Sequence, residues 1–289
     1  MAAVPPPPEI HRSVLTYRRG LYGKIALLLV AVSILLYALH APAGGIANGG
    51  TWVGYLLGTI GLALIVWLGW FGIRRRQYGP KMFLLEEWLS AHVYLGLALV
   101  VTATLHTAFR FGWNVHTLAY GLMVVVILSG AFGLYAFRRY PAAMTKNRNG
   151  TPYKSLIEAI VALDFECREL AMSFDDETAA LVYQATCTLP AFRFRDLSSR
   201  ERVSPTLEAP ARAAIARLRA LVGKTYSADQ ANVMPLVQAL TNRALAVARL
   251  RRDQRYRVLM QIWRVIHLPL TVGLLVALGI HVLAVFYFW

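Results

Sequence analysis

Five apolar runs, each long enough to cross a bilayer as a helix, constrain this chain more than any other feature. A spanning helix needs about 20 predominantly apolar residues. Runs of this kind occupy residues 22–40, 52–73, 84–109, 117–137 and 263–289. The mean hydropathy of +0.48 is too high for an ordinary soluble domain. Strand patterning is absent apart from a short alternating stretch at 192–195. The sequence therefore predicts an all-α integral membrane bundle of five transmembrane helices.

Charged residues concentrate between the fourth and fifth apolar runs. Residues 141–257 hold 18 of the 30 Lys and Arg and 12 of the 15 Asp and Glu. Apolar residues recur there at helical spacing, and nothing breaks the last helical segment before the fifth span. We therefore predict that this last helix runs on into the membrane. The predicted divisions are an N-terminal tail (1–20), transmembrane helices 1–4 (21–140), a helical insert (141–257) and transmembrane helix 5 (258–289).

Basic residues outside the insert predict how the spans are oriented. There are twelve of them, and only Arg110 lies on the opposite side of the spans from the other eleven. Cytoplasmic loops carry the excess of Lys and Arg in membrane proteins. The tail and the insert are therefore predicted to be cytoplasmic and the C-terminus outside, in a bacterial inner membrane. The third and fifth spans then run parallel. The net charge of +15 is explained by this topology, so we expect membrane lipid and no nucleic acid as a partner.

The third and fifth runs each carry two histidines fourteen residues apart, His92 with His106 and His267 with His281. Fourteen residues turn an α-helix through about 1400°, some 40° short of four full turns, and rise about 21 Å. Both histidines of a pair therefore lie on nearly one face. On parallel helices, His92 and His267 share the cytoplasmic half, and His106 and His281 share the outer half. Each of these two combinations is predicted to ligate the iron of one haem b.

Small and cationic residues accompany these histidines. Gly96 and Gly273 lie within the two histidine-bearing runs, where a missing side chain would leave room for a macrocycle. Arg110 and Arg264 lie about one turn outside the outer and inner ligands, and are candidates for binding haem propionates. Ordinary structural roles are also open to these residues, because small residues mediate plain helix packing and Arg264 fits simple anchoring on the cytoplasmic side.

Histidines within a span can also have an ordinary role, such as a hydrogen bond to a neighbouring helix. Intramembrane ionisable groups are nevertheless functional candidates by default, and two equal spacings on parallel helices favour ligation. His40 and His116 lie at the outer ends of the first and fourth runs. Either could replace an outer ligand, bind a propionate, contact a quinone or be interfacial without a special role.

The two cysteines do not indicate a metal or redox site. Cys167 and Cys187 are twenty residues apart, with no CxxC motif and no histidine nearby. A disulfide is not expected in a cytoplasmic segment. We predict that both are small core residues.

The histidine pattern resembles membrane cytochromes b with bis-histidine haems, and is similar to the ferric-reductase-like transmembrane family and to cytochrome b561-type proteins. The resemblance covers the five spans and excludes the insert. It depends on Trp88-Leu-Ser-Ala-His92, Leu105-His106, His267-Leu-Pro and His281. Those reductases usually fuse or recruit a flavin and nicotinamide module, whereas no GxGxxG or flavin fingerprint occurs in this chain. Their loop before the last span is also normally short.

The sequence hypothesis is a di-haem b-type subunit of a hetero-oligomeric membrane redox complex. Electrons would pass between a cytoplasmic flavoprotein or iron–sulfur subunit, the two haems, and an outer-face partner or a membrane quinone, the small-molecule substrate that this hypothesis favours. Two alternatives come from other classes. One is a histidine-lined metal or proton transporter, which the near absence of Asp, Glu, Asn and Gln in the spans disfavours. The other is a structural membrane anchor of a larger assembly.

Overall fold

The computed structural model describes residues 18–40, 49–74, 85–187, 209–222 and 230–288. This part of the chain contains helices and no strand, as the sequence predicts. The helices are α1 (Leu21–Leu39), α2 (Trp52–Arg74), α3 (Leu85–Thr107), α4 (Val115–Asn147), α5 (Tyr153–Ala171), α6 (Asp176–Thr186), α7 (Ala209–Val222) and α8 (Gln230–Phe288). The short stretch at 192–195 lies outside the described residues.

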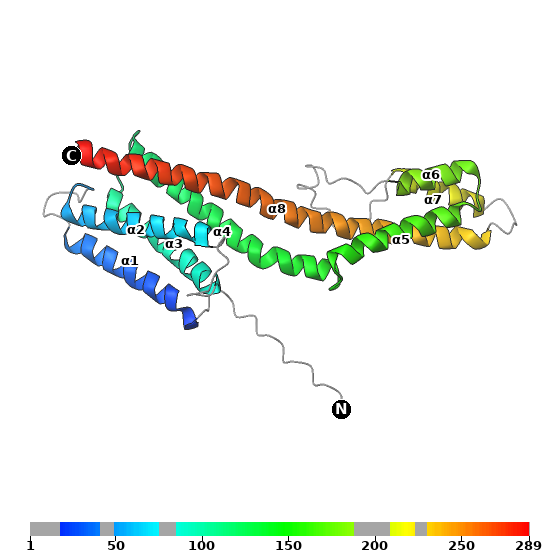
Figure 1. Cartoon of the computed structure of the whole chain (residues 1–289), viewed down its shortest axis with the longest axis horizontal. Helices are drawn as coiled ribbons and strands as arrows, with labels where there is room; N and C mark the ends of the chain where they lie inside the picture. The colour runs from blue at the N-terminus through cyan, green and yellow to red at the C-terminus, as the bar shows by residue number, and fades with distance from the viewer. Residues whose placement is uncertain (1–17, 41–48, 75–84, 188–208, 223–229, 289) are drawn as a thin grey trace, which may run out of the picture. The chain divides into compact units, whose positions relative to one another are not determined.

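Five of these helices are long and apolar enough to cross a membrane. They are α1, α2, α3, α4 and α8, which confirms the predicted number of spans. The helix α8 is continuous over 59 residues (Figure 1). The prediction that the last helix before the fifth span continues into that span is therefore confirmed. The side of the membrane on which each end lies stays a prediction.

The chain divides into two compact units. The first consists of Met1–Leu134 with Arg264–Trp289, and the second of Tyr135–Trp263. Both α4 and α8 supply residues to each unit. The first unit carries all four of the predicted ligands, and the second contains the stretch predicted as an insert.

The first unit is a helical bundle whose core lies between α2, α3, α4 and the end of α8. Ile65, Leu99, Met123 and Leu274, one from each of these helices, form a buried cluster. The helix α1 packs against α3, which also packs against α2 (Figure 1). Large apolar side chains on the outer faces are exposed instead, as on α1, where Leu27 is 70% exposed. Apolar faces of this kind suit contact with lipid tails.

Polar contacts join the start of α1 to the start of α3 in the first unit. The hydroxyl of Tyr22 donates a hydrogen bond to Glu87 over 3.0 Å, and Arg18 forms an ion pair with the same carboxylate at 3.4 Å. Glu87 itself is buried. A buried carboxylate is costly unless it is paired and hydrogen-bonded, so these contacts explain how an acid is accommodated at this end of α3.

The second unit has its own apolar core. Cys167 on α5, Val182 on α6, Leu218 on α7 and Leu236 on α8 are completely buried in one cluster. These positions follow the helical periodicity that predicts helices in the insert. Beside this core, the guanidinium of Arg243 on α8 forms a buried ion pair with Asp164 on α5.

The prediction for the two cysteines is correct for one of them and wrong for the other. Cys167 is completely buried in the core, whereas Cys187 is exposed at the C-terminal end of α6. Burial raises the pKa of the Cys167 thiol to about 12. The reactive form of cysteine is the thiolate, so Cys167 is inert at neutral pH. The sequence shows both residues in apolar surroundings, but only packing decides which helix face is covered.

This difference makes Cys187 a reporter of topology. We expect a membrane-impermeant maleimide to label Cys187 in inverted membrane vesicles and to leave intact spheroplasts unlabelled, because the second unit is predicted to be cytoplasmic. The measurement is the mass of the labelled protein, with one label per chain. The Cys187→Ser variant should remain unlabelled, and denaturation should expose Cys167 as a second site. Labelling of intact spheroplasts would show that the predicted orientation is wrong.

Candidate haem site

The structure places the predicted outer pair of histidines side by side. The rings of His106 on α3 and His281 on α8 lie with their centres 6.1 Å apart and their planes at 86°. The other predicted pair, His92 and His267, lies about four turns earlier on the same two helices. Leu99 and Leu274, each seven residues before His106 and His281, share one buried cluster. The helix α3 and the last part of α8 therefore run parallel.

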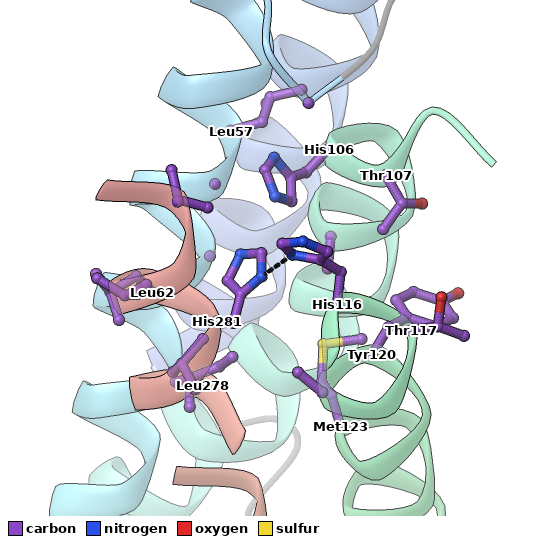
Figure 2. A pocket seen from close by; sticks show the side chains of 18 of the residues that line it. Leu57, Leu62, His106, Thr107, His116, Thr117, Tyr120, Met123, Leu278 and His281 are labelled. Carbon is purple, nitrogen blue, oxygen red and sulfur yellow. Dashed lines mark hydrogen bonds between the residues drawn. The ribbon is translucent and has the colours of Figure 1, made fainter. Parts of the chain in front are cut away.

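A cavity of about 700 Å³ adjoins the outer combination. Its walls come from α2, α3, α4 and α8 and are mostly apolar, with Leu57, Met123 and Leu278 among the lining residues. His106, His116 and His281 point toward one another at this cavity (Figure 2). Pockets of about 300–1,000 Å³ with an apolar wall and a few convergent polar groups are typical of cofactor sites. The outer cavity has both properties.

The separation of the outer rings fits a metal held between them. A metal bound at about 2 Å from each of two ring nitrogens, which lie about 1 Å from their ring centres, separates those centres by about 6 Å. The observed separation of His106 and His281 is 6.1 Å. The ring separation of the outer combination is therefore compatible with a metal held between the two imidazoles.

Hydrogen bonds engage one ring nitrogen, Nδ1, in three of the four histidines. The Nδ1 atom of His106 lies 2.7 Å from the carbonyl oxygen of Gly54 on α2. The Nδ1 atom of His267 lies 3.2 Å from the hydroxyl of Ser129 on α4, and that of His281 is hydrogen-bonded to His116. Histidines that ligate metals almost always donate their other ring N–H to such a partner. For His106, the carbonyl acceptor places the proton on Nδ1, which leaves Nε2 as the unprotonated nitrogen.

Glycines on neighbouring helices accommodate the histidine rings. A Cβ atom at Gly58 on α2 would lie 2.7 Å from Cε1 of His106, and one at Gly130 on α4 would lie 3.7 Å from Cε1 of His267. At Gly96 and Gly273, a Cβ atom would meet no atom within 4 Å. The predicted glycines thus border open space, whereas a side chain at Gly58 would press against the predicted ligand His106.

The two predicted arginines differ in their surroundings. Arg110 lines the outer cavity, so its guanidinium is available to an anionic group bound there. Arg264 is exposed, and no ion pair of the described residues includes it. The structure thus places Arg110 next to a cavity. For Arg264, haem-propionate binding and simple anchoring on the cytoplasmic side both stay open.

Near the predicted inner ligand His92, residues of α2 and α3 are in contact. His92 interacts with the backbone of Leu68 on α2. Close by in sequence, Trp67 and Trp88 stack with their ring centres 4.9 Å apart and their planes at 12°. This stack joins the end of α2 to the start of α3 and places two large rings near the predicted inner ligand.

The structure also separates the two histidines whose roles the sequence leaves open. His40 is exposed at the end of α1, with its ring edge-on to Trp52 at 4.6 Å. His116 instead lines the outer cavity and contacts His281 directly. Gly54, Ser129 and His116 are the neighbours that sequence reasoning does not assign to particular ligands. In the sequence, these three residues stand out only as small or polar residues in or beside an apolar run.

In the described part of the chain, no group of three or more His, Cys, Asp and Glu side chains is arranged to hold a metal ion by itself. Comparisons of the chain with protein-family models, with curated proteins and with solved structures found no match.

Proposed function

We propose that this protein is a di-haem b-type cytochrome subunit of a membrane redox complex. The observation that carries the proposal is the outer site, where two facing imidazoles from parallel helices have the separation that a bis-histidine metal needs. The cavity beside them and the hydrogen bonds at Nδ1 of both rings support the same interpretation. His92 and His267 lie about 21 Å earlier along the same two helices by the helix rise, where they would form the inner site.

The haem iron would supply the one-electron chemistry, and the protein would supply ligation, spacing and electrostatics. His106 and His281 would hold the outer haem, and His92 and His267 the inner one. Arg110 would bind a propionate of the outer haem through its guanidinium, and Arg264 would be the corresponding group at the inner surface. The glycines beside the rings keep the helices close without filling the space that the macrocycles need.

Electrons would cross the membrane between partners at its two faces. A cytoplasmic flavoprotein or iron–sulfur subunit would exchange electrons with the inner haem, and a quinone or an outer-face redox protein with the outer haem. The second unit, with its independent core, would offer the docking surface for the cytoplasmic subunit. The complex would lie in a bacterial inner membrane, with membrane lipid around the first unit.

An absorption spectrum of the purified protein tests this function. After expression with sufficient haem, the dithionite-reduced protein should show the sharp α-band of low-spin haem b, with about two haems per chain. A transporter or a structural anchor would give a colourless protein. A colourless preparation from haem-replete cells would overturn the proposal.

The close approach of Gly58 to His106 gives a more specific prediction. In the Gly58→Ala variant, the new methyl group would lie 2.7 Å from Cε1 and 3.0 Å from Nδ1 of His106. The ring must then move away from the carbonyl of Gly54 that holds it. Loss of such a supporting contact typically weakens metal binding about 10–100-fold. We therefore expect the outer haem to be depleted, as measured by haem content and by potentiometric titration.

Gly61→Ala is the matched control on the same helix. A methyl group at this position would lie 3.8 Å from Leu99, which is an ordinary van der Waals distance, so both haems should remain. Equal haem content in the two variants would show that His106 is not held against α2 in the haem-loaded protein.

A further inference from the structure

We infer that His116 is a positioning residue for the outer site, acting through His281. This inference rests on the proposed function, and deepens it, because it assigns a residue that supports one ligand. The imidazoles of His116 and His281 are hydrogen-bonded through their Nδ1 atoms (Figure 2). Their ring centres lie 4.5 Å apart, with the planes at 88°.

The arrangement of the three outer histidines distinguishes ligand from support. His106 and His281 have the ring separation of about 6 Å that a metal between two imidazoles needs. His116 lies closer to His281, with ring centres 4.5 Å apart, and the two Nδ1 atoms are hydrogen-bonded to each other. His116 therefore contacts the ring nitrogen of His281 that would not hold the metal, whereas His106 would lie on the metal's other side.

The hydrogen bond has one chemically consistent direction when His281 is a ligand. A ligating imidazole uses an unprotonated nitrogen for the metal and carries its proton on the other nitrogen. If Nε2 of His281 held the metal, Nδ1–H of His281 would donate a hydrogen bond to the unprotonated Nδ1 of His116. His116 is then neutral and carries its own proton on Nε2. The contact thus fixes the tautomer and the ring orientation of His281.

The group that is hydrogen-bonded to Nδ1 of His281 differs from the groups at Nδ1 of His106 and His267. His106 is held by a backbone carbonyl and His267 by a hydroxyl, whereas His281 is held by an imidazole nitrogen. Accepting the N–H of a ligand makes that ligand more basic, and an imidazole nitrogen is a more basic acceptor than a carbonyl or a hydroxyl. A more basic axial ligand favours the oxidised iron, so His116 should lower the reduction potential of the outer haem.

The test is a potentiometric titration of the full chain, purified with its haems, as wild type, His116→Leu and His116→Asn. Leucine cannot accept a hydrogen bond, whereas the Oδ1 atom of asparagine can take the place of Nδ1. In His116→Leu we expect the outer haem to be retained at least about 10-fold less tightly. The fraction that remains should titrate at a more positive potential. In His116→Asn, haem retention should return toward that of wild type. The inner haem serves as the internal control and should not change.

The outcomes separate this inference from the function on which it rests. Wild-type protein without haem would overturn both. Two haems in wild type, with retention and potential unchanged in His116→Leu, would overturn the positioning role and leave the function standing. Complete loss of the low-spin outer haem in both variants would show that His116 is itself a ligand, which would also overturn the positioning role.

Discussion

Replacing His92 or His267 by leucine is expected to lower the haem content from about two to about one per chain, with loss of the same redox component in both variants. Replacing His106 or His281 should remove the other component. The reason is that each haem would need two axial imidazoles. His106 lies beside His281, and His92 with His267 is the pair predicted about four turns earlier on the same helices. Haem quantification and potentiometric titration of the four variants provide the measurement.

His40→Leu is the matched control for this series. His40 also lies near the outer end of a span, but it is exposed and packs against Trp52, so both haems should remain. A different grouping, such as loss of the same component in the His92 and His106 variants, would contradict the combination of ligands across α3 and α8. Retention of two haems in every variant would contradict ligation by these residues altogether.

The Asp164→Leu variant is expected to destabilise the second unit by about 3–5 kcal/mol, because it leaves the buried guanidinium of Arg243 without its carboxylate. The side chains of Arg243 and Asp164 are only 4% and 12% exposed. Each 1.4 kcal/mol corresponds to a tenfold change in an equilibrium. Amides of α5 that exchange through opening of this unit should therefore exchange at least about 100-fold faster, as measured by hydrogen–deuterium exchange of the membrane-embedded protein.

Two comparisons make this prediction specific. The double variant Asp164→Leu with Arg243→Met removes both charges and should exchange at close to the wild-type rate, because replacing a buried pair by apolar groups is often neutral or stabilising. Arg217→Met breaks an exposed ion pair with Asp175, and exposed pairs contribute little to stability. Equal exchange rates in Asp164→Leu and Arg217→Met would show that the buried pair does not hold α5 against α8.

Local patterns in the sequence predict much of the fold. Apolar runs of bilayer length predict the five spanning helices, and helical spacing of apolar residues predicts α5, α6 and α7. The unbroken pattern before the fifth span predicts the continuity of α8. Such predictions succeed because helix periodicity and length depend on neighbours within a few turns. The exposure of Cys187 is missed, because it depends on which face of α6 other helices cover.

For the candidate site, the sequence alone determined which histidines share a helix face and at what interval, since 3.6 residues per turn fixes both. Only the tertiary structure decided which group is hydrogen-bonded to Nδ1 of each imidazole. Gly54, Ser129 and His116 meet their histidines across 52, 138 and 165 residues of chain. Contacts of this kind arise from side-by-side packing of helices that are distant in sequence, and no local periodicity encodes them. The ligands could therefore be predicted before their supporting groups.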